Sequence, residues 1–244
     1  PGGALNKILP GYEQRPEQVA AALAVQRNLG RSDRLLLEAG TGSGKTLAYL
    51  VPTVASGVRA MVSTATKTLQ EQILGKDLPL LERALGRRID AQLMKGRANY
   101  FCILRAQRYT AQQLLPGLAE RRRLERVVRW SNETHTGDRA ELSFLPESWP
   151  TWRELSATSE QCAGRSCAEY ERCWVVTMRQ RAQTAELVIV NHHLYFADLS
   201  LRTRLGDGAL AVLPAHEAVV FDEAHEVEET AAQHFGVKVS DARL

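Results

Sequence analysis

A short apolar run followed by a glycine-rich turn constrains this chain more than any other feature. Leu35-Leu36-Leu37 has the pattern of a buried strand, and a helical stretch begins at about Lys45. The turn between them, residues 39–46, reads Ala-Gly-Thr-Gly-Ser-Gly-Lys-Thr. Strand, glycine-rich loop and helix in this order form the context in which such a turn cradles phosphate. A parallel α/β sheet is therefore expected around this loop.

The residues of the loop suit a nucleoside triphosphate. Backbone N–H groups of the turn and of the helix N-terminus bind phosphate oxygens. Lys45 is expected to reach the β- and γ-phosphates of ATP, and the Thr46 hydroxyl to bind Mg²⁺. Ala39 stands where the general pattern has glycine, a mild departure. The predicted nucleotide-binding residues of the loop are Ala39, Gly40, Thr41, Gly42, Ser43, Gly44, Lys45 and Thr46.

A second apolar run, residues 218–221, ends in the acidic pair Asp222 and Glu223. Open α/β sheets place ligand chemistry at the carboxyl ends of their strands. Asp222 is expected to hold Mg²⁺ and Glu223 to orient and polarise the attacking water, so these two and Lys45 form the predicted catalytic set. An acidic pair alone is often a solvated loop, and the upstream phosphate loop is what favours the catalytic interpretation.

Apolar and helical patterns predict one lobe with an interruption. Strands alternating with helices favour a RecA-like parallel sheet with helices on both faces, over residues 1–95 and 182–244. Residues 96–181 are expected to form a small, mostly helical insert. Pro52 predicts a kink or an early end of the helix after the loop. Helices are expected at 14–29 and 67–85, and strands near 34–38, 59–63, 91–94, 187–190 and 219–221.

Charge and aromatic residues concentrate in the insert. The whole chain has a net charge of +3, whereas residues 95–181 hold 15 Lys and Arg against 10 Asp and Glu. All four tryptophans lie there as well, and basic residues interleaved with aromatics suit a path for single-stranded nucleic acid. Packing in a core is the commoner use of tryptophan. No apolar run approaches the ~18 residues that span a membrane, and no signal peptide is visible, so a cytoplasmic protein without a membrane partner is expected.

The four cysteines, Cys102, Cys162, Cys167 and Cys173, all lie in the insert, separated by 59, 4 and 5 residues. In the cytoplasm they are expected to be metal ligands rather than disulfides. Structural zinc ligands usually come in pairs two to four residues apart, whereas iron–sulfur clusters accept more varied spacing. From the spacing alone, three alternatives remain: the cysteines bind an iron–sulfur cluster, they bind zinc, or they are unrelated buried thiols. We expect so small an insert to have little core of its own, so that ligation supplies much of its folding free energy.

Together these motifs resemble the N-terminal part of the iron–sulfur superfamily 2 DNA helicases, in particular the bacterial DinG/YoaA branch, which is related to XPD. The resemblance covers nearly the whole chain. The motifs that carry it are Arg15-Pro16-Glu17-Gln18, residues 38–46, Ser63-Thr64-Ala65-Thr66, Leu69-Gln70-Glu71-Gln72, residues 95–102 with the later cysteines, Val190-Asn191-His192-His193-Leu194 and Asp222-Glu223-Ala224-His225.

The resemblance implies an ATP-dependent helicase that moves 5′→3′ on single-stranded and forked DNA, with a 4Fe–4S cluster on the four cysteines. It implies that residues 1–95 and 182–244 are helicase lobe 1, ending in the start of a following insertion. It suggests that Gln18, with Arg15, reads the adenine, that Ser63 and Thr64 lie beside the DNA backbone, and that His225 couples the two sites.

Two other functions stay open on the sequence. The chain could be a nucleotide- and metal-binding sensor that does not unwind, or part of an RNA-directed helicase, because the Asp-Glu-Ala-His string does not choose between DNA and RNA. The later helicase motifs of the family, including its arginine finger, are absent. We therefore expect a piece of a longer protein, weakly active or inactive by itself.

Overall fold

The computed structural model describes residues 8, 13, 15–31, 33–40, 42–112, 117–205 and 211–236, so Thr41 lies outside the described residues. The chain divides into two units. The first comprises Pro1–Met94 with Ala182–Leu244, and the second Lys95–Arg181.

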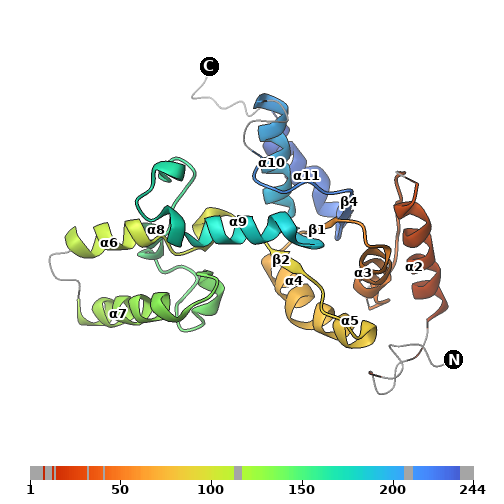
Figure 1. Ribbon diagram of the computed structural model, residues 1–244, viewed down its shortest axis with the longest axis horizontal. Coiled ribbons are helices and arrows are strands. Elements are labelled where there is room, and N and C mark those ends of the chain that lie inside the picture. Colours follow the sequence, from red (N-terminus) through yellow and green to blue (C-terminus); the bar gives the residue numbers. More distant parts are fainter. Residues whose placement is uncertain are drawn as a thin grey trace. The chain divides into compact units, whose positions relative to one another are not determined.

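A four-stranded parallel sheet forms the centre of the first unit, with the strand order β2–β3–β1–β4 (Figure 1). Its strands are β1 (Ala60–Thr64), β2 (Ala91–Leu93), β3 (Leu187–Asn191) and β4 (Ala218–Phe221). Ala60 is in register with Leu187 on one side and with Ala218 on the other. Because parallel strands end at one edge, the residues that follow β1, β3 and β4 meet there.

Helices cover the sheet, with α4 and α5 on one side and α10 on the other (Figure 1). Leu50 and Leu81 pack against Val62 and Ile189 in the main core. The helices of this unit are α2 (Pro16–Leu29), α3 (Lys45–Ser56), α4 (Lys67–Gln72), a π-helical turn (Ile73–Asp77), α5 (Leu78–Leu85), α10 (His192–Leu205), a 3₁₀ turn (Ala224–Glu226) and α11 (Val227–Phe235).

Most elements expected from the sequence are confirmed, but the strand at 34–38 is wrong. Residues 33–40 carry no strand assignment, and Leu35, Leu36 and Leu37 are 42%, 91% and 43% exposed. An apolar run becomes a strand only when a neighbouring strand pairs with its N–H and C=O groups. No described strand pairs with this run. The helix after the loop also does not end early, since α3 continues four residues beyond Pro52.

The second unit is mostly helical and has its own apolar core. Its elements are 3₁₀ turns at Arg97–Asn99, Arg139–Glu141, Gly164–Ser166 and Tyr170–Arg172, with α6 (Ile103–Gln112), α7 (Leu118–Glu133), α8 (Trp152–Leu155) and most of α9 (Trp174–Thr184). Val127 and Leu155 are fully buried, and Trp149 and Trp152 are each 4% exposed. The expectation of little core is therefore wrong, because Trp149, from the loop before α8, and Trp152, the first residue of α8, fill the interior.

Three of the four tryptophans of this unit have their indole N–H hydrogen-bonded, whereas Trp174 Nε1 is buried without a hydrogen-bond partner among the described residues. Trp149 Nε1 donates to the Glu120 carboxylate at 3.0 Å, and Trp152 Nε1 donates to the carbonyl of Ala98 at 2.8 Å. Trp130 Nε1 donates to Glu141 at 2.8 Å. The Trp149 and Trp152 rings, buried and held by such bonds, are not free to stack on bases. None of the described helices is long and apolar enough to cross a membrane.

Candidate functional site

The glycine-rich loop is held by two side chains from the start of α2. Gly42 and Gly44 have φ values of +74° and +81°, a conformation that glycine adopts without strain. Arg15 Nη1 donates to the carbonyl of Gly42, and Gln18 Nε2 donates to the carbonyl of Gly44 at 3.0 Å. A Cβ atom at position 44 would lie 2.1 Å from Gln18 Nε2. The structure thus places Arg15 and Gln18 on the loop backbone, beside the phosphate site.

Ser43 closes the loop from within. Its hydroxyl donates to the carbonyl of Gly40 at 2.8 Å, so the turn is tight before α3 begins. Gly44 occupies the N-cap position of α3 and has no side chain to cover the first N–H groups of the helix. These N–H groups and the positive end of the helix dipole are suited to bind an anion.

Lys45 and Glu223 form an ion pair across the site. Lys45 Nζ lies 3.6 Å from Glu223 Oε1, and both side chains are about one-third exposed, at 33% and 31%. The sequence placed both residues in the catalytic set, and the structure brings them together from α3 and from the end of β4. The Glu223 carboxylate is thus the described partner of the Lys45 ammonium group.

Asp222 is connected to the phosphate-loop helix through Tyr49. The Tyr49 hydroxyl donates to Asp222 Oδ2 at 3.1 Å. Burial raises the pKa of Tyr49 well above its ordinary value, the adjacent Asp222 charge raises it further, and a hydrogen bond with the Thr46 side chain opposes the shift. Thr46 and Asp222 therefore surround one phenol oxygen. A hydroxyl and a carboxylate so placed fit Mg²⁺, which takes one or two protein carboxylates and completes its shell with other oxygens.

Glu223 adopts a backbone conformation that is uncommon for its residue type. It is the one described non-glycine residue with positive φ, at +55°. Its N–H donates to Asp222 Oδ1 at 3.1 Å, and its carbonyl accepts from the Glu226 N–H at 3.0 Å. Such conformations gather at active sites, where surrounding contacts maintain them.

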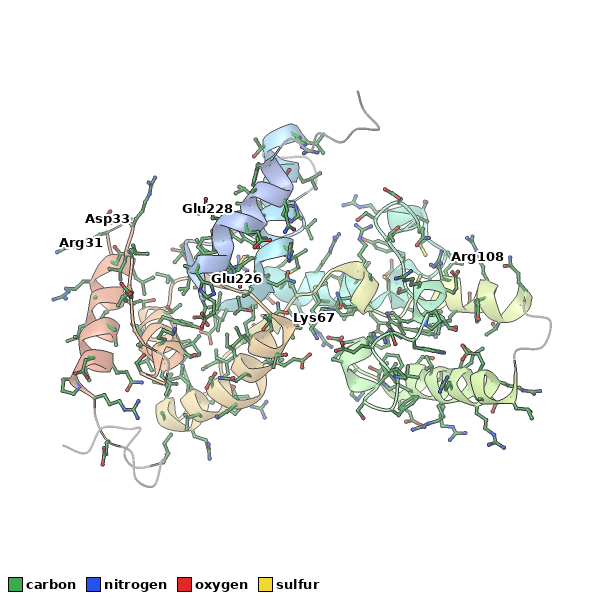
Figure 2. The ribbon with its side chains drawn as sticks, turned by 180° about the vertical axis from the view of Figure 1, so that it is seen from behind. Arg31, Asp33, Lys67, Arg108, Glu226 and Glu228 are labelled. Carbon is green, nitrogen blue, oxygen red and sulfur yellow. The ribbon has the colours of Figure 1, made fainter. Side chains whose placement is uncertain are left out.

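His225 and its neighbours lie at the outer side of this turn. His225 has a side chain that is 70% exposed, with Nδ1 3.5 Å from Glu223 Oε2 and Nε2 3.6 Å from Glu226 Oε1. Glu226 and Glu228 follow at the start of α11 (Figure 2). His225 therefore contacts the acidic residues, without a described contact to β1.

Ser63 and Thr64 end β1 and are both 0% exposed. The Ser63 hydroxyl lies 2.7 Å from Nδ1 of His192, and Thr64 Oγ1 donates to the carbonyl of Thr66 at 3.1 Å. Burial lowers the pKa of His192, while the backbone of Asp222 and Glu223 faces the ring and opposes the decrease. No hydrogen bond of normal geometry reaches His192 Nε2.

Tyr49 and His192 are site residues that the sequence interpretation missed. Tyr49 stands one helical turn after Lys45, so it faces the same side of α3. His192 stands in the Asn-His-His string, which the resemblance noted without a role. The spacing of Tyr49 from Lys45 and the place of His192 in the Asn-His-His string were the sequence features that could have identified these two residues.

The four cysteines of the insert lie near one another. All four are unpaired and half-buried. Burial is the main cause that raises the pKa of Cys102, a backbone hydrogen bond at Arg105 opposes it, and the other three cysteines add repulsion. Among the described residues, no three His, Cys, Asp or Glu side chains are arranged to hold one metal ion. A four-iron cluster binds each thiolate to a different iron, so its sulfurs need not converge on one point.

Comparison with known proteins agrees with a P-loop nucleotide-binding lobe. The family model described as DEAD/DEAH box helicase matches residues 15–100, and the model described as DEAD_2 matches residues 122–244. The chain therefore belongs to the DEAD_2 family, in the group that contains the YoaA and DinG helicases.

Individual relatives cover nearly all of this chain. The ATP-dependent DNA helicase YoaA of Haemophilus influenzae is 39% identical over 242 residues, which is 99% of this chain and 37% of the relative. YoaA of Escherichia coli is 36% identical over 247 residues, covering 100% of this chain and 38% of the relative. The ATP-dependent helicase DinG of Mycobacterium tuberculosis is 32% identical over 261 residues, 97% of this chain and 38% of the relative. The chain thus spans less than two-fifths of the length of these relatives.

Proposed function

We propose that this chain is the first motor lobe, with its cysteine insert, of an ATP-dependent DNA helicase. The observation that carries the proposal is the convergence of Lys45, Thr46, Asp222 and Glu223 on one edge of the sheet, through the Lys45–Glu223 pair and the Tyr49 bridge. Relatives named as ATP-dependent DNA helicases support the choice of DNA.

In the proposed reaction, the loop N–H groups and Lys45 bind the β- and γ-phosphates of ATP. Lys45 exchanges the Glu223 carboxylate for phosphate oxygens, which frees Glu223 to accept a hydrogen bond from the attacking water. Thr46 and Asp222 would hold Mg²⁺, whose charge stabilises the phosphate oxygens. Tyr49 keeps Asp222 in place by its hydrogen bond. Arg15 and Gln18 support the loop, and the proposed reading of adenine by Gln18 would need its side chain to reach beyond Gly44.

We further propose that Cys102, Cys162, Cys167 and Cys173 hold one 4Fe–4S cluster. Each of the other three cysteines lies close enough to Cys102 to raise its pKa by repulsion, which supports one shared site, and the resemblance to iron–sulfur helicases favours a cluster over zinc. The cluster would tie the first turn of α6 to the loop that precedes α9. Iron and sulfide analysis of anaerobically purified protein tests this, because zinc gives neither inorganic sulfide nor a visible absorption band.

The insert also supports the proposed binding of single-stranded DNA. Arginines line α7, where Arg121 and Arg123 are 63% and 46% exposed and pair with Glu125 and Glu120 of the same helix. Arg108 on α6 projects outward (Figure 2). Exposed basic side chains neutralise phosphates and make binding depend on salt. With Trp149 and Trp152 buried in the core, we expect phosphate contacts rather than stacking on these two tryptophans to dominate on this unit.

The experiment that separates the competing functions uses the full-length protein. ATP hydrolysis is measured with no nucleic acid, with single-stranded DNA and with single-stranded RNA of the same sequence. The proposal predicts stimulation by DNA. Stimulation by RNA alone would favour an RNA-directed helicase, and DNA-stimulated turnover without unwinding of a forked duplex would favour a sensor.

A further inference from the structure

His192 is buried where three neighbouring strands end. It is 1% exposed and directly follows β3, while its Nδ1 lies 2.7 Å from the Ser63 hydroxyl at the end of β1. Its ring centroid lies 6.0 Å from that of Phe221, the last residue of β4. The proposed function gives this histidine no role, although its environment connects all three strands.

The residue before His192 fixes its position along the chain. Asn191 Oδ1 accepts the N–H of Leu194 at 2.9 Å and so caps the first turn of α10. His192 is the first residue of that helix. The Asn-His-His string thus has a structural explanation: the asparagine sets where α10 starts, and the first histidine is thereby set against β1 and β4.

Ser63 is hydrogen-bonded to both His192 and Asp222. Its carbonyl accepts the Asp222 N–H at 2.8 Å, and its hydroxyl pairs with His192. The Asp222 carboxylate in turn accepts the N–H of Glu223, the residue with the left-handed backbone, at 3.1 Å. The bonds therefore form a continuous chain from His192 through Ser63 to the acidic pair.

A buried imidazole is well suited to such a link. A neutral ring has one nitrogen that donates and one that accepts, so it can bond a hydroxyl on one side and face backbone groups on the other. A hydroxyl can rotate to match either ring tautomer. Replacing the ring by a hydrocarbon would leave the Ser63 hydroxyl buried without its partner, and the end of β1 would shift to satisfy it.

We propose that His192 and Ser63 are positioning residues that hold Asp222 and Glu223 in their catalytic arrangement and connect the end of β1 to them. This inference rests on the proposed ATP hydrolysis. It also gives Ser63 a role different from the one expected from the sequence: its side chain holds His192 inside the lobe. Movement of β1 on binding a DNA strand would reach the acidic pair through this chain of bonds.

The test compares variants of the full-length protein. His192→Phe keeps a flat buried ring and removes both nitrogens, while His192→Asn keeps a polar atom near the position of Nδ1. His193→Phe is the matched control, because His193 is the adjacent, exposed histidine of the same helix turn. ATP affinity, DNA-stimulated kcat and the midpoint of thermal unfolding are measured for each.

We expect His192→Phe to lower the stimulated kcat by about 10- to 100-fold, the usual cost of losing a group that orients a metal-site ligand. ATP affinity should stay within about twofold, because this chain of bonds does not include the phosphate loop. His192→Asn should recover part of the rate, and His193→Phe should match the wild type.

Ser63→Ala covers the case in which His192→Phe does not fold. It should lower the stimulated kcat in the same way, and the Ser63→Ala, His192→Phe double variant should lose no more than the worse single variant, because both break one contact. Normal kcat in His192→Phe or Ser63→Ala, or fully additive losses, would overturn the inference and leave the proposed function standing. Absence of DNA-stimulated hydrolysis in the wild type would instead refute the proposed function, and the inference with it.

Discussion

The hydroxyl of Tyr49 donates a hydrogen bond of 3.1 Å to Oδ2 of Asp222, joining the phosphate-loop helix to the acidic turn across 173 residues of chain. The Tyr49 side chain is buried, and its pKa is raised by burial first and by Asp222 next, so the hydroxyl is a neutral donor at physiological pH. Through this bond the two predicted Mg²⁺ ligands keep a common partner before any nucleotide binds.

Tyr49→Phe should therefore lower the free energy of unfolding by about 1 kcal/mol, the usual net value of a hydrogen bond. Denaturant unfolding of the wild type and the variant measures the difference. Tyr109→Phe is the control, because the Tyr109 hydroxyl makes no hydrogen bond within the described part of the insert, and this change should have little effect on stability. Equal stabilities of wild type and Tyr49→Phe would show that the bond contributes nothing.

Lys45→Ala and Glu223→Gln should fail in different ways in the full-length protein. Lys45→Ala removes the ammonium that binds the β- and γ-phosphates, so ATP binding and hydrolysis should both be lost. Glu223→Gln keeps the size of the side chain but removes its base function, so ATP should bind while hydrolysis falls at least ~10²-fold. ATP titration and steady-state hydrolysis are the measurements.

Stability provides the control for this pair of variants. Because the Lys45–Glu223 ion pair is about one-third exposed, breaking it should change the free energy of unfolding by only about 0.5 kcal/mol. Equal loss of ATP binding in both variants would exclude Glu223 as the water-activating residue. Near-normal turnover in Lys45→Ala would exclude the phosphate-loop assignment.

Cys167→Ser should abolish the cluster and unwinding while leaving ATP binding close to wild type. The nucleotide site lies in the other unit, and the insert keeps its core of Trp149, Trp152 and Leu155, so far-UV circular dichroism should change little. Iron and sulfide content, ATP titration and a helicase assay on full-length protein are compared. Ser166→Ala is the neighbouring control. Normal unwinding of forked DNA by Cys167→Ser would identify the cysteines as ordinary thiols.

The 244-residue chain alone should hydrolyse ATP slowly, even with single-stranded DNA present. The lobe supplies the phosphate loop and the acidic pair, whereas helicase motors of this superfamily complete the site with an arginine from a second lobe. Such an arginine contributes ~10³–10⁵ in rate. Turnover by the isolated chain is compared with that of the full-length protein. Equal DNA-stimulated rates would contradict the expectation.

The sequence predicted the parts of the site whose chemistry is local. The run from Gly40 to Thr46 needs particular residues at adjacent positions, so the pattern itself indicates phosphate binding. Asp222 and Glu223 were found because they end an apolar run. Tyr49 and His192 were missed because their partners are 173 and 129 residues away, and only the register of β1, β3 and β4 brings them together.

The prediction of a strand at 34–38 was wrong for a related reason: strand formation also depends on a partner distant in the sequence. Apolar residues such as Leu36 indicate a preference for burial. A strand also needs a neighbouring strand to complete its hydrogen bonds, and a short apolar run does not show whether such a neighbour exists. For the insert, little core was expected from the sequence, although core packing was given as the commoner use of tryptophan. Trp149 and Trp152 do pack in a core, and segments on both sides of α7 build that core together.

Strand separation by the full-length protein tests the central claim most directly. Two duplexes of the same sequence are compared, one with a 5′ single-stranded tail and one with a 3′ tail, with ATP and Mg²⁺ present and with Glu223→Gln as the hydrolysis-deficient control. The account predicts ATP-dependent unwinding of the 5′-tailed duplex by the wild type, little unwinding of the 3′-tailed duplex, and none by Glu223→Gln. Failure to unwind either duplex by a protein that binds ATP and carries iron, or equal unwinding by Glu223→Gln, would contradict it.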